Sequence, residues 1–454
     1  MNVIVSHVFS DANKGDAALL SVLLSDIRRA WQRSDITILT IDNVHPGSTF
    51  EGVPVERAFM FHALNRYKYR PAKFVYSLFV MGSTLIDAAC YRLTGWSTPL
   101  PRHLRRVADM YRKADTVLPV GGGYLRGKPG LASTMELCLM LHPLVLARLL
   151  GKPTIHYSQS VGPFGNRLQA KLAAWVLRRV TLLIVREDIT RALLHKLGVR
   201  RNVVRSIDSA FLLPSNNAKD VRLELGIPDG QLVVGITVRD WLKGAAQRSY
   251  ENAVAALADH IRAKHRAAVV FIPQVTAEHH GDDDRKASAR VAALMGDRSG
   301  VYVIKDHYDH KSIKSLYGGL DYLVGTRFHS VIFALTSYVP ALAIEYEHKT
   351  RGILQDLELE KWVTPIEGVT ADELITLFDA LARERASYLK TLHKTLPGYV
   401  KQAAQTIELA VAAYADTTAT RRLKRWYANP TTEATILPAS QAKPMPVNPS
   451  GKKA

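Results

Sequence analysis

The feature that most limits the fold of this chain is a repeated alternation of short apolar segments with stretches of helical spacing. One series of apolar segments comprises MNVIVSHVF, DITILTID, ADTVLPVGGG, KPTIHYSQSVGP, TLLIVRED and NVVRSIDSAFLLP. A second series comprises QLVVGITVRDW, AAVVFIPQVT, GVYVIKD, DYLVGTRFHS and YVPALAIEY. Strands that alternate with helices in this way are typical of a doubly wound parallel sheet. The sequence therefore predicts an α/β fold with two Rossmann-like doubly wound domains that face each other across a cleft.

A polar stretch between residues 215 and 230 separates the two series. We therefore predict an N-terminal Rossmann-like domain over residues 1–215 and a C-terminal one over residues 228–395. Helical sequence continues over residues 396–427. The remaining residues, 428–454, are rich in Pro, Ala, Ser and Lys, and this composition predicts a disordered basic tail.

The charge and the cysteine content narrow the class of protein. A formal net charge of +19 produces a field that attracts phosphates, nucleic acids and anionic lipid headgroups. The sequence has no zinc-finger spacing, RNA-binding aromatic strand or basic heptad pattern, so we expect no nucleic-acid partner. Its two cysteines, Cys90 and Cys138, exclude a disulfide-rich scaffold and a four-thiolate zinc site. With no signal-peptide pattern at the start, these features predict a cytoplasmic protein.

One apolar segment, AKFVYSLFVMGSTLIDAACY at residues 72–91, is long enough to raise the question of a membrane. It contains Asp87 as well as serine and threonine, and arginine and lysine residues flank it, which disfavours a transmembrane span. Two readings fit better. The segment is either a basic-edged helix in peripheral contact with an anionic membrane or a buried core helix.

Polar residues and glycines follow the predicted strands in both series. They include Asn13, Gly15, Asp16, Gly121, Gly122, Gly123, Gln159, Arg186, Asp208, Arg239, Gln274, Arg327 and His329. In open α/β sheets, ligands bind beyond the carboxyl ends of the strands, so these residues are candidates for one site. Several of them have structural alternatives, and Asp208, for example, could simply cap the next turn. Asp16 could cap the helix after the first strand, and His329 could be a core histidine bonded to backbone.

The ordered series of motifs resembles the polysaccharide pyruvyl transferase family. The resemblance rests on Asn13-x-Gly15-Asp16, Gly121-Gly122-Gly123, Gln159-x-x-Gly162-Pro163, Asp208-x-Ala210, Gly325-x-Arg327-x-His329-Ser330 and Tyr346-x-x-Lys349. It runs from about Val5 to about Gly352. The resemblance implies a GT-B-like pair of domains and an enzyme that moves the pyruvyl group of phosphoenolpyruvate onto a sugar as a ketal. Phosphoenolpyruvate would be a co-substrate, and we expect no cofactor and no metal.

The resemblance also implies that Arg327 and His329 bind the donor. Phosphoenolpyruvate carries a carboxylate and a phosphate, which the planar guanidinium of arginine matches bidentately. From the residues themselves we add Arg239, Lys243 and Lys349 as donor-binding candidates in the C-terminal domain.

His329 and Asp16 are the predicted catalytic residues. Histidine serves as an acid and a base near neutral pH because its ordinary pKa is about 6.5. We expect the neighbouring Arg327 to disfavour the protonated imidazole unless bound substrate anions offset its charge.

The acceptor is expected against the N-terminal domain, across the cleft from the donor. Its candidate residues are Asn13, Gly15, Gly121, Gly122, Gly123 and Gln159. The sugar would belong to a polysaccharide, a glycolipid or a lipid-linked precursor. Oligomeric state is left open.

Two alternative functions remain at this point. A GT-B glycosyltransferase would use the same architecture with a nucleotide sugar, and Glu345 could then be the acidic residue that contacts uridine. A non-enzymatic protein that binds polyanions or membranes would tolerate His329→Ala. The acidic run at residues 282–284, after His279 and His280, is interpreted as a solvated loop rather than a cation site.

Overall fold

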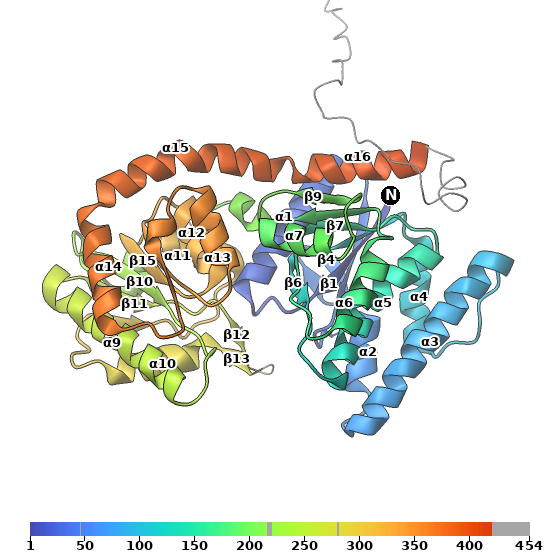
Figure 1. The fold of residues 1–454 in the computed structure, drawn as a ribbon, viewed down its shortest axis with the longest axis horizontal. Coiled ribbons are helices and arrows are strands. Elements are labelled where there is room, and N and C mark those ends of the chain that lie inside the picture. Colours follow the sequence, from blue (N-terminus) through green and yellow to red (C-terminus); the bar gives the residue numbers. More distant parts are fainter. Residues whose placement is uncertain (46, 216–219, 279–280, 420–454) are drawn as a thin grey trace, which may run out of the picture.

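The computed structural model of the chain describes residues 1–45, 47–215, 220–278 and 281–419. The predicted tail at 428–454 and the end of the predicted helical segment lie outside these residues, and so do His279 and His280. Two α/β domains lie side by side, and one long helical stretch runs across both (Figure 1).

The N-terminal domain contains two sheets that continue one another. The first has the order β3-β4-β2-β1-β5 and is parallel except for the β3–β4 pair. Its strands are β1 (Asn2–Val8), β2 (Asp35–Thr40), β3 (Thr49–Phe50), β4 (Val53–Arg57) and β5 (Thr116–Pro119). The second is the parallel sheet β6 (Gly122–Leu125), β7 (Ile155–Val161), β8 (Leu182–Val185) and β9 (Val203–Arg205). An isolated parallel bridge between Val117 and Thr154 places β5 beside β7.

Helices connect these strands. They are α1 (Lys14–Ala30), α2 (Phe59–Asn65), α3 (Arg70–Thr94), α4 (Arg102–Lys113), α5 (Leu131–Leu149), α6 (Arg167–Leu177) and α7 (Asp188–Lys196). All six strands predicted from the first apolar series are present. The last of them is shorter than its apolar segment, because Ser209–Leu212 forms a 3-10 helix, η1, whose first turn is capped by the Asp208 side chain.

The C-terminal domain holds one parallel sheet with the order β14-β11-β10-β15-β16-β17. Its strands are β10 (Val233–Thr237), β11 (Ala268–Phe271), β14 (Val301–Val303), β15 (Tyr322–Gly325), β16 (Ala341–Glu345) and β17 (Val363–Pro365). The order places the chain reversal between β10 and β15, the two strands that carry Arg239 and Arg327 at their ends. This is the doubly wound topology that the alternation predicted.

The remaining C-terminal elements surround this sheet. The helices are α8 (Val221–Leu225), α9 (Ala245–His265), α10 (Asp284–Leu294), α11 (His310–Gly318), α12 (Phe328–Thr336), α13 (Lys349–Asp356) and α14 (Ala371–Arg383), with a 3-10 turn, η3 (Glu360–Trp362). A small antiparallel hairpin pairs β12 (Thr276–Ala277) with β13 (Asp282–Asp283). The acidic run is therefore not a solvated loop: it forms β13 and opens α10, and Asp284 is buried.

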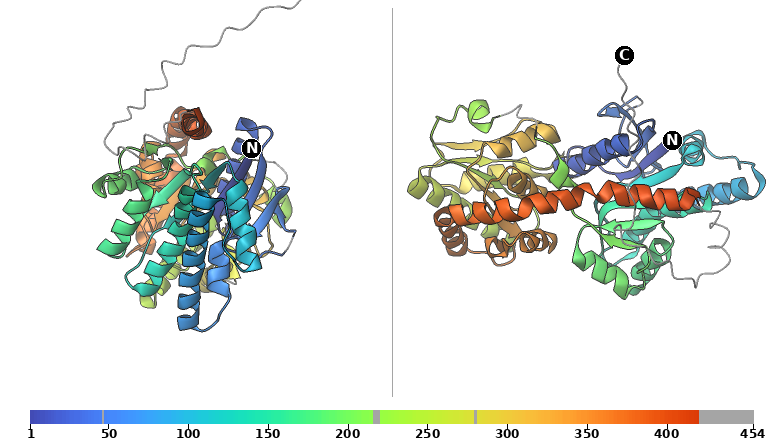
Figure 2. Two further views of the ribbon diagram at one scale, coloured as in Figure 1. Left: turned by 90° about the vertical axis from the view of Figure 1, so that its right-hand side faces the viewer. Right: turned by 90° about the horizontal axis from the view of Figure 1, so that it is seen from above.

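Two features hold the domains together. The helices α15 (Arg385–Ala404) and α16 (Thr406–Ala419) run from the C-terminal domain back along the N-terminal one, where α16 packs against β7 and α1 (Figures 1 and 2). Helix α1 also packs against α11 and α12 of the other domain. Because α1 is buried along most of its length, its first turn is fixed at the junction of the two domains.

Helix α3 is the exception to this packing. It lies at the outer edge of the N-terminal domain, away from the other domain (Figure 1). Helices α3 and α5 are both long and apolar enough to cross a membrane, but 28% of the apolar window of α3 is buried against 56% for α5. The alternative that residues 72–91 form a buried core helix is therefore wrong.

Candidate functional site

The first turn of α1 places a carboxylate at the domain junction. Asn13 caps the helix, because its Oδ1 accepts from the backbone N–H of Gly15 at 3.1 Å and of Asp16 at 3.4 Å. Its Nδ2 donates to Oδ2 of Asp16 at 2.9 Å. The alternative that Asp16 caps the helix is wrong, since Asn13 does so and orients the Asp16 carboxylate.

The surroundings of Asp16 change its acidity. Desolvation raises the pKa of Asp16 to about 6, although the cations of Arg186, Lys349 and Arg327 act in the opposite direction. Asp208 adds to the rise. A carboxyl group with this pKa exists in both protonation states near neutral pH, which suits it to proton transfer.

His329 reaches the same place from the C-terminal domain. It lies in the first turn of α12, directly after β15. A Cβ atom built on Gly15 would lie 1.9 Å from Nδ1 of His329, so only glycine allows the imidazole to approach the first turn of α1 this closely. The site is therefore completed by contact between the domains.

The imidazole of His329 is not bonded to backbone in the described part of the chain, so the core-histidine alternative is wrong. Its Nε2 is buried without a hydrogen-bond partner among the described residues. The nearest carboxylate oxygen is Oδ2 of Asp208 at 3.9 Å, which is beyond hydrogen-bonding distance. A buried, unpaired ring nitrogen is available to a ligand.

His329 is neutral near pH 7 in this arrangement. Burial is the main cause that lowers its pKa well below the ordinary value, and Arg186, Lys349 and Arg327 lower it further. The predicted direction is right. The cause predicted from sequence, Arg327 alone, is only the last of these.

Arg186 is a buried cation that acts on both Asp16 and His329. Its Nη1 donates to Oδ2 of Asp208 at 2.5 Å and its Nε to Oγ of Ser160 at 2.8 Å. The guanidinium carbon lies 5.2 Å from the centre of the Phe328 ring, across the domain junction. Arg186 is thus a fixed buried cation whose hydrogen bonds come from its own domain.

Arg327 is occupied by carboxylates. Its Nε donates to Asp284 at 3.0 Å, and its Nη atoms bond to Asp284 and Asp282. A donor anion would have to share or displace these carboxylates. The structure therefore places Arg327 at the site with its guanidinium already paired.

Arg239 is differently placed. Its guanidinium carbon lies 4.2 Å from the centre of the Tyr346 ring and 4.7 Å from that of Trp241. Within the described residues no carboxylate pairs with it, and its Nε is buried without a partner. Two aromatic rings hold a buried arginine here while its donors stay free for an anion.

Further cations gather around Glu347. Its carboxylate accepts from Lys349 at 2.7 Å and from Arg126 of the N-terminal domain at 2.9 Å. Burial acts against the ionised form, yet Lys349, Arg126 and Arg239 hold the pKa of Glu347 below its usual value. Lys349 and Arg126 share this one carboxylate and Arg239 adds a third cation nearby, which leaves net positive charge. The predicted Lys243 is solvent-exposed in the turn before α9 and pairs with no described carboxylate.

On the N-terminal side, the glycine triplet brings two strands close together. A Cβ on Gly121 would lie 2.7 Å from the carbonyl oxygen of Ser158 in β7. Gly122 and Gly123 belong to β6 rather than to a turn, and Gly122 pairs with Gln159. Gln159 is buried, and its Nε2 has no partner in the described part of the chain. Its amide nitrogen is therefore available to a ligand or a water molecule.

Sequence reasoning missed a histidine group beside Gln159. The His156 ring bonds to Gln159, and the His7 ring stacks on Tyr124 with 4.8 Å between ring centres. Burial lowers the pKa of His7 to about 4 and that of His156 to about 3, so both are neutral. A signal for this group was present in the sequence, because His7 and His156 are polar residues inside apolar strands, β1 and β7, and a glycine-containing turn follows each strand.

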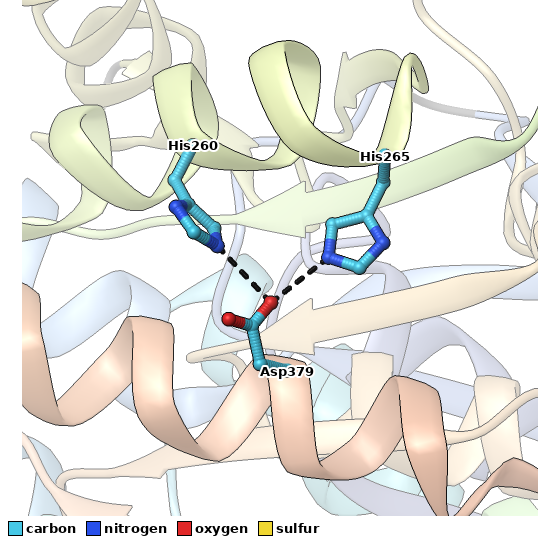
Figure 3. A group of neighbouring side chains, drawn as sticks. All are labelled: His260, His265 and Asp379. Carbon is cyan, nitrogen blue, oxygen red and sulfur yellow. Dashed lines mark hydrogen bonds and ion pairs between the residues drawn. The ribbon is translucent and has the colours of Figure 1, made fainter.

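A second polar group lies on other elements. His260 and His265 at the end of α9 contact Oδ1 of Asp379 on α14, at 3.0 and 2.9 Å (Figure 3). Each of the three residues offers one atom that could bind a metal ion, and these three atoms lie within 4.8 Å of one another. Lys264 pairs with the same carboxylate at 2.7 Å, so the group already balances its charges and ties α9 to α14.

Comparison with known proteins agrees with the motif series. The family model described as "Polysaccharide pyruvyl transferase" matches residues 13–348. The amylovoran biosynthesis protein AmsJ of Erwinia amylovora is 25% identical over 290 residues, which cover 61% of this chain and 67% of that protein.

Solved structures match the fold. The UDP-GlcNAc 2-epimerase of Neisseria meningitidis superposes with a TM-score of 0.58 at 11% identity, covering 92% of this chain and 100% of that one. A UDP-N-acetylglucosamine 2-epimerase-like protein of Listeria monocytogenes gives 0.57 at 12% identity, covering 93% and 98%. At such identities the likeness concerns the fold alone, and the predicted GT-B-like pair of Rossmann-like domains is confirmed.

Proposed function

Because the chain belongs to the polysaccharide pyruvyl transferase family, we propose that it transfers the pyruvyl group of phosphoenolpyruvate to two hydroxyls of one sugar as a ketal. The family and its relative AmsJ support a transferase of polysaccharide biosynthesis. The observation that carries the finer proposal is the buried, unpaired Nε2 of His329, a ring whose pKa is lowered by the nearby cations of Arg186, Lys349 and Arg327.

The reaction needs proton transfers in a definite order. The methylene carbon of phosphoenolpyruvate gains a proton and becomes a methyl group, while a sugar hydroxyl adds to the neighbouring carbon and loses its proton. A second hydroxyl of the sugar then displaces phosphate, and its proton leaves with the phosphate. Two C–O bonds form and one C–O bond to phosphate breaks, so no oxidant or reductant is required.

Asp16 and His329 supply complementary protonation states. The environment raises the pKa of Asp16 and lowers that of His329, which favours a protonated carboxyl group and a neutral imidazole. We assign neutral His329 as the base that accepts the hydroxyl proton, and protonated Asp16 as the acid for the methylene carbon. Such divergent pKa values in one site are typical of an acid–base pair.

The donor's anionic groups match the cations around Glu347. Arg239 offers an unpaired guanidinium, and Lys349 and Arg126 have only one carboxylate between them. An incoming phosphate could replace Glu347 as their partner, because cations outnumber carboxylates here and form charge-assisted hydrogen bonds with phosphate oxygens. Arg327 contributes charge rather than direct bonds in this arrangement.

The acceptor side is assigned to the N-terminal domain. Asn13 orients Asp16, and Gly15 leaves room for His329, so both shape the place where a sugar hydroxyl would meet the donor. Gly122 pairs with Gln159 and leaves room for the Tyr124 ring, so these residues shape the same part of the N-terminal domain. The proposed partners are phosphoenolpyruvate and a saccharide acceptor in the cytoplasm, with no cofactor.

The glycosyltransferase alternative predicts that Glu345 is free to contact the uridine of a nucleotide sugar, and the structure gives this less support. Both oxygens of Glu345 are engaged by Arg351, through its Nε at 2.7 Å and its backbone N–H at 3.2 Å. A ribose would therefore compete with an ion pair.

Calorimetric titration tests the donor directly. Phosphoenolpyruvate and a uridine-diphosphate sugar are titrated separately into the native protein and into Arg239→Ala. The proposal requires binding of phosphoenolpyruvate that the substitution weakens. Binding of the nucleotide sugar alone would overturn it in favour of glycosyl transfer.

A further inference from the structure

Helix α3 exposes an apolar stripe on the side that faces away from the protein. Its outward face carries apolar residues at helical spacing, namely Val75, Leu78, Phe79, Ile86 and Leu93. With 3.6 residues per turn, all five fall on one stripe about a third of the circumference wide. Val75 and Ile86 are 64% and 61% exposed and Leu93 is 84% exposed. A soluble helix normally turns such a stripe inward.

The opposite face of α3 contacts the protein and mixes polar with apolar side chains. Ser77, Thr84 and Asp87 are buried there together with Val80 and Ala88. Oγ1 of Thr84 bonds to Nε2 of His142 at 2.8 Å, and the Asp87 carboxylate pairs with Arg112 and accepts from the Thr98 backbone at 2.8 Å. These bonds fix α3 to the domain along one side, so it cannot leave to span a bilayer as a single helix.

The ends of the stripe carry aromatic and basic side chains. Tyr69, 71% exposed, precedes the helix, and Trp96, 80% exposed, follows it. Between residues 66 and 106 the sequence has eight arginine or lysine residues and one carboxylate, which is the buried Asp87. Aromatic rings at both ends of an apolar stripe, with a basic surround, are typical of helices that lie in the headgroup region of an anionic membrane.

We propose that the outward face of α3, with Tyr69 and Trp96 at its ends, docks on the surface of an anionic phospholipid bilayer. A second copy of the chain fits less well, because self-association would bring two strongly basic regions together. The helix is about 37 Å long at 1.5 Å per residue, and it lies parallel to the bilayer plane with its opposite face on the protein. Membrane docking by α3 does not depend on binding of phosphoenolpyruvate, because α3 contains none of the cations of the candidate site.

Flotation of the full chain with vesicles tests this surface without any substrate. The native protein should bind vesicles that contain phosphatidylglycerol, bind pure phosphatidylcholine less, and be released as salt is raised. Val75→Ser with Phe79→Ser and Ile86→Ser should weaken binding roughly tenfold or more, because three apolar groups no longer leave water. The matched control replaces three exposed apolar residues elsewhere, Leu168, Ile189 and Leu223, with serine.

A second readout follows Trp96 itself. Its fluorescence should shift to shorter wavelength on adding anionic vesicles, and Trp96→Phe should remove that part of the shift. Circular dichroism of each variant confirms folding. Equal vesicle binding by the α3 triple variant and the control would overturn the proposal. So would a native protein that ignores vesicles but forms dimers that the α3 substitutions dissociate.

Discussion

The imidazole of His329 lies so close to the backbone of Gly15 that a Cβ on Gly15 would come within 1.9 Å of Nδ1. One residue belongs to the first turn of α1 and the other to the first turn of α12, so this contact joins the two domains. It also brings His329 to the helix turn that carries Asp16. The position of the proposed base therefore depends on the absence of a side chain 314 positions earlier in the chain.

Gly15→Ala should reduce turnover while leaving the protein folded. The methyl group would push the imidazole out of its place against the first turn of α1, and a displacement of about 1 Å can cost roughly 10²-fold in rate. Steady-state kinetics with phosphoenolpyruvate checks this. Gly398→Ala in α15, where the added Cβ meets nothing within 4 Å, should keep full activity and gain stability slightly. Equal activity of the two variants would contradict the contact's role.

Arg239→Ala should raise the dissociation constant of phosphoenolpyruvate about 10- to 100-fold, since charge-assisted hydrogen bonds contribute about 1.5–3 kcal/mol. Arg239→Lys should recover only part of this, because an ammonium lacks the planar fork that lies between Trp241 and Tyr346. Titration calorimetry measures both. The control is Arg248→Ala, which removes an exposed arginine on α9 and should leave the dissociation constant of phosphoenolpyruvate unchanged. If Arg248→Ala weakens binding as much as Arg239→Ala does, the effect comes from the overall charge of the protein and not from a contact with Arg239.

The pH dependence of kcat/KM should reveal Asp16. As the proposed acid, Asp16 must be protonated, so the rate should fall as pH rises through its pKa of about 6. Asp16→Asn should be slow and should lose this limb of the profile. A limb that persists in Asp16→Asn belongs to another group, and the assignment of Asp16 would then be wrong.

The same group should limit stability. Its folded-state pKa of about 6 exceeds its ordinary value of 3.8, so the folded state binds a proton more tightly than the unfolded one. The resulting stabilisation is present below pH 4 and is lost as pH rises through 6. Asp16→Asn should therefore stabilise the protein above pH 6, by up to about 3 kcal/mol, and should gain nothing below pH 4. Urea unfolding at both pH values measures the difference.

The fold was largely predictable because most strands are buried on both faces and appear as short apolar runs. Strand β17 was missed, since Val363–Pro365 is only three residues long and includes a proline. Helix α3 left two readings open because its apolar stripe looks the same in sequence whether it faces a core or a membrane. Only its contacts with Arg112 and His142 reveal which side is inward.

The site was predictable as a set of strand ends but not as a set of roles. Arg239 and Arg327 each follow a strand of the same sheet, and sequence gives no reason to separate them. The difference comes from Asp282 and Asp284, which the β12–β13 hairpin brings to Arg327 and not to Arg239. The cations around Glu347 include Arg126 from the other domain, a pairing 221 residues apart in sequence.

The most direct test of the account is product formation by native protein and His329→Gln. Each is incubated with phosphoenolpyruvate and a saccharide fraction from the source cells, and released phosphate is measured against ketal-linked pyruvyl groups on saccharide by mass spectrometry. The account predicts equal amounts of both products from the native protein, and a rate roughly 10²- to 10⁴-fold lower in His329→Gln with phosphoenolpyruvate still bound. Undiminished ketal formation by His329→Gln, or phosphate released without any pyruvylated saccharide, would contradict it.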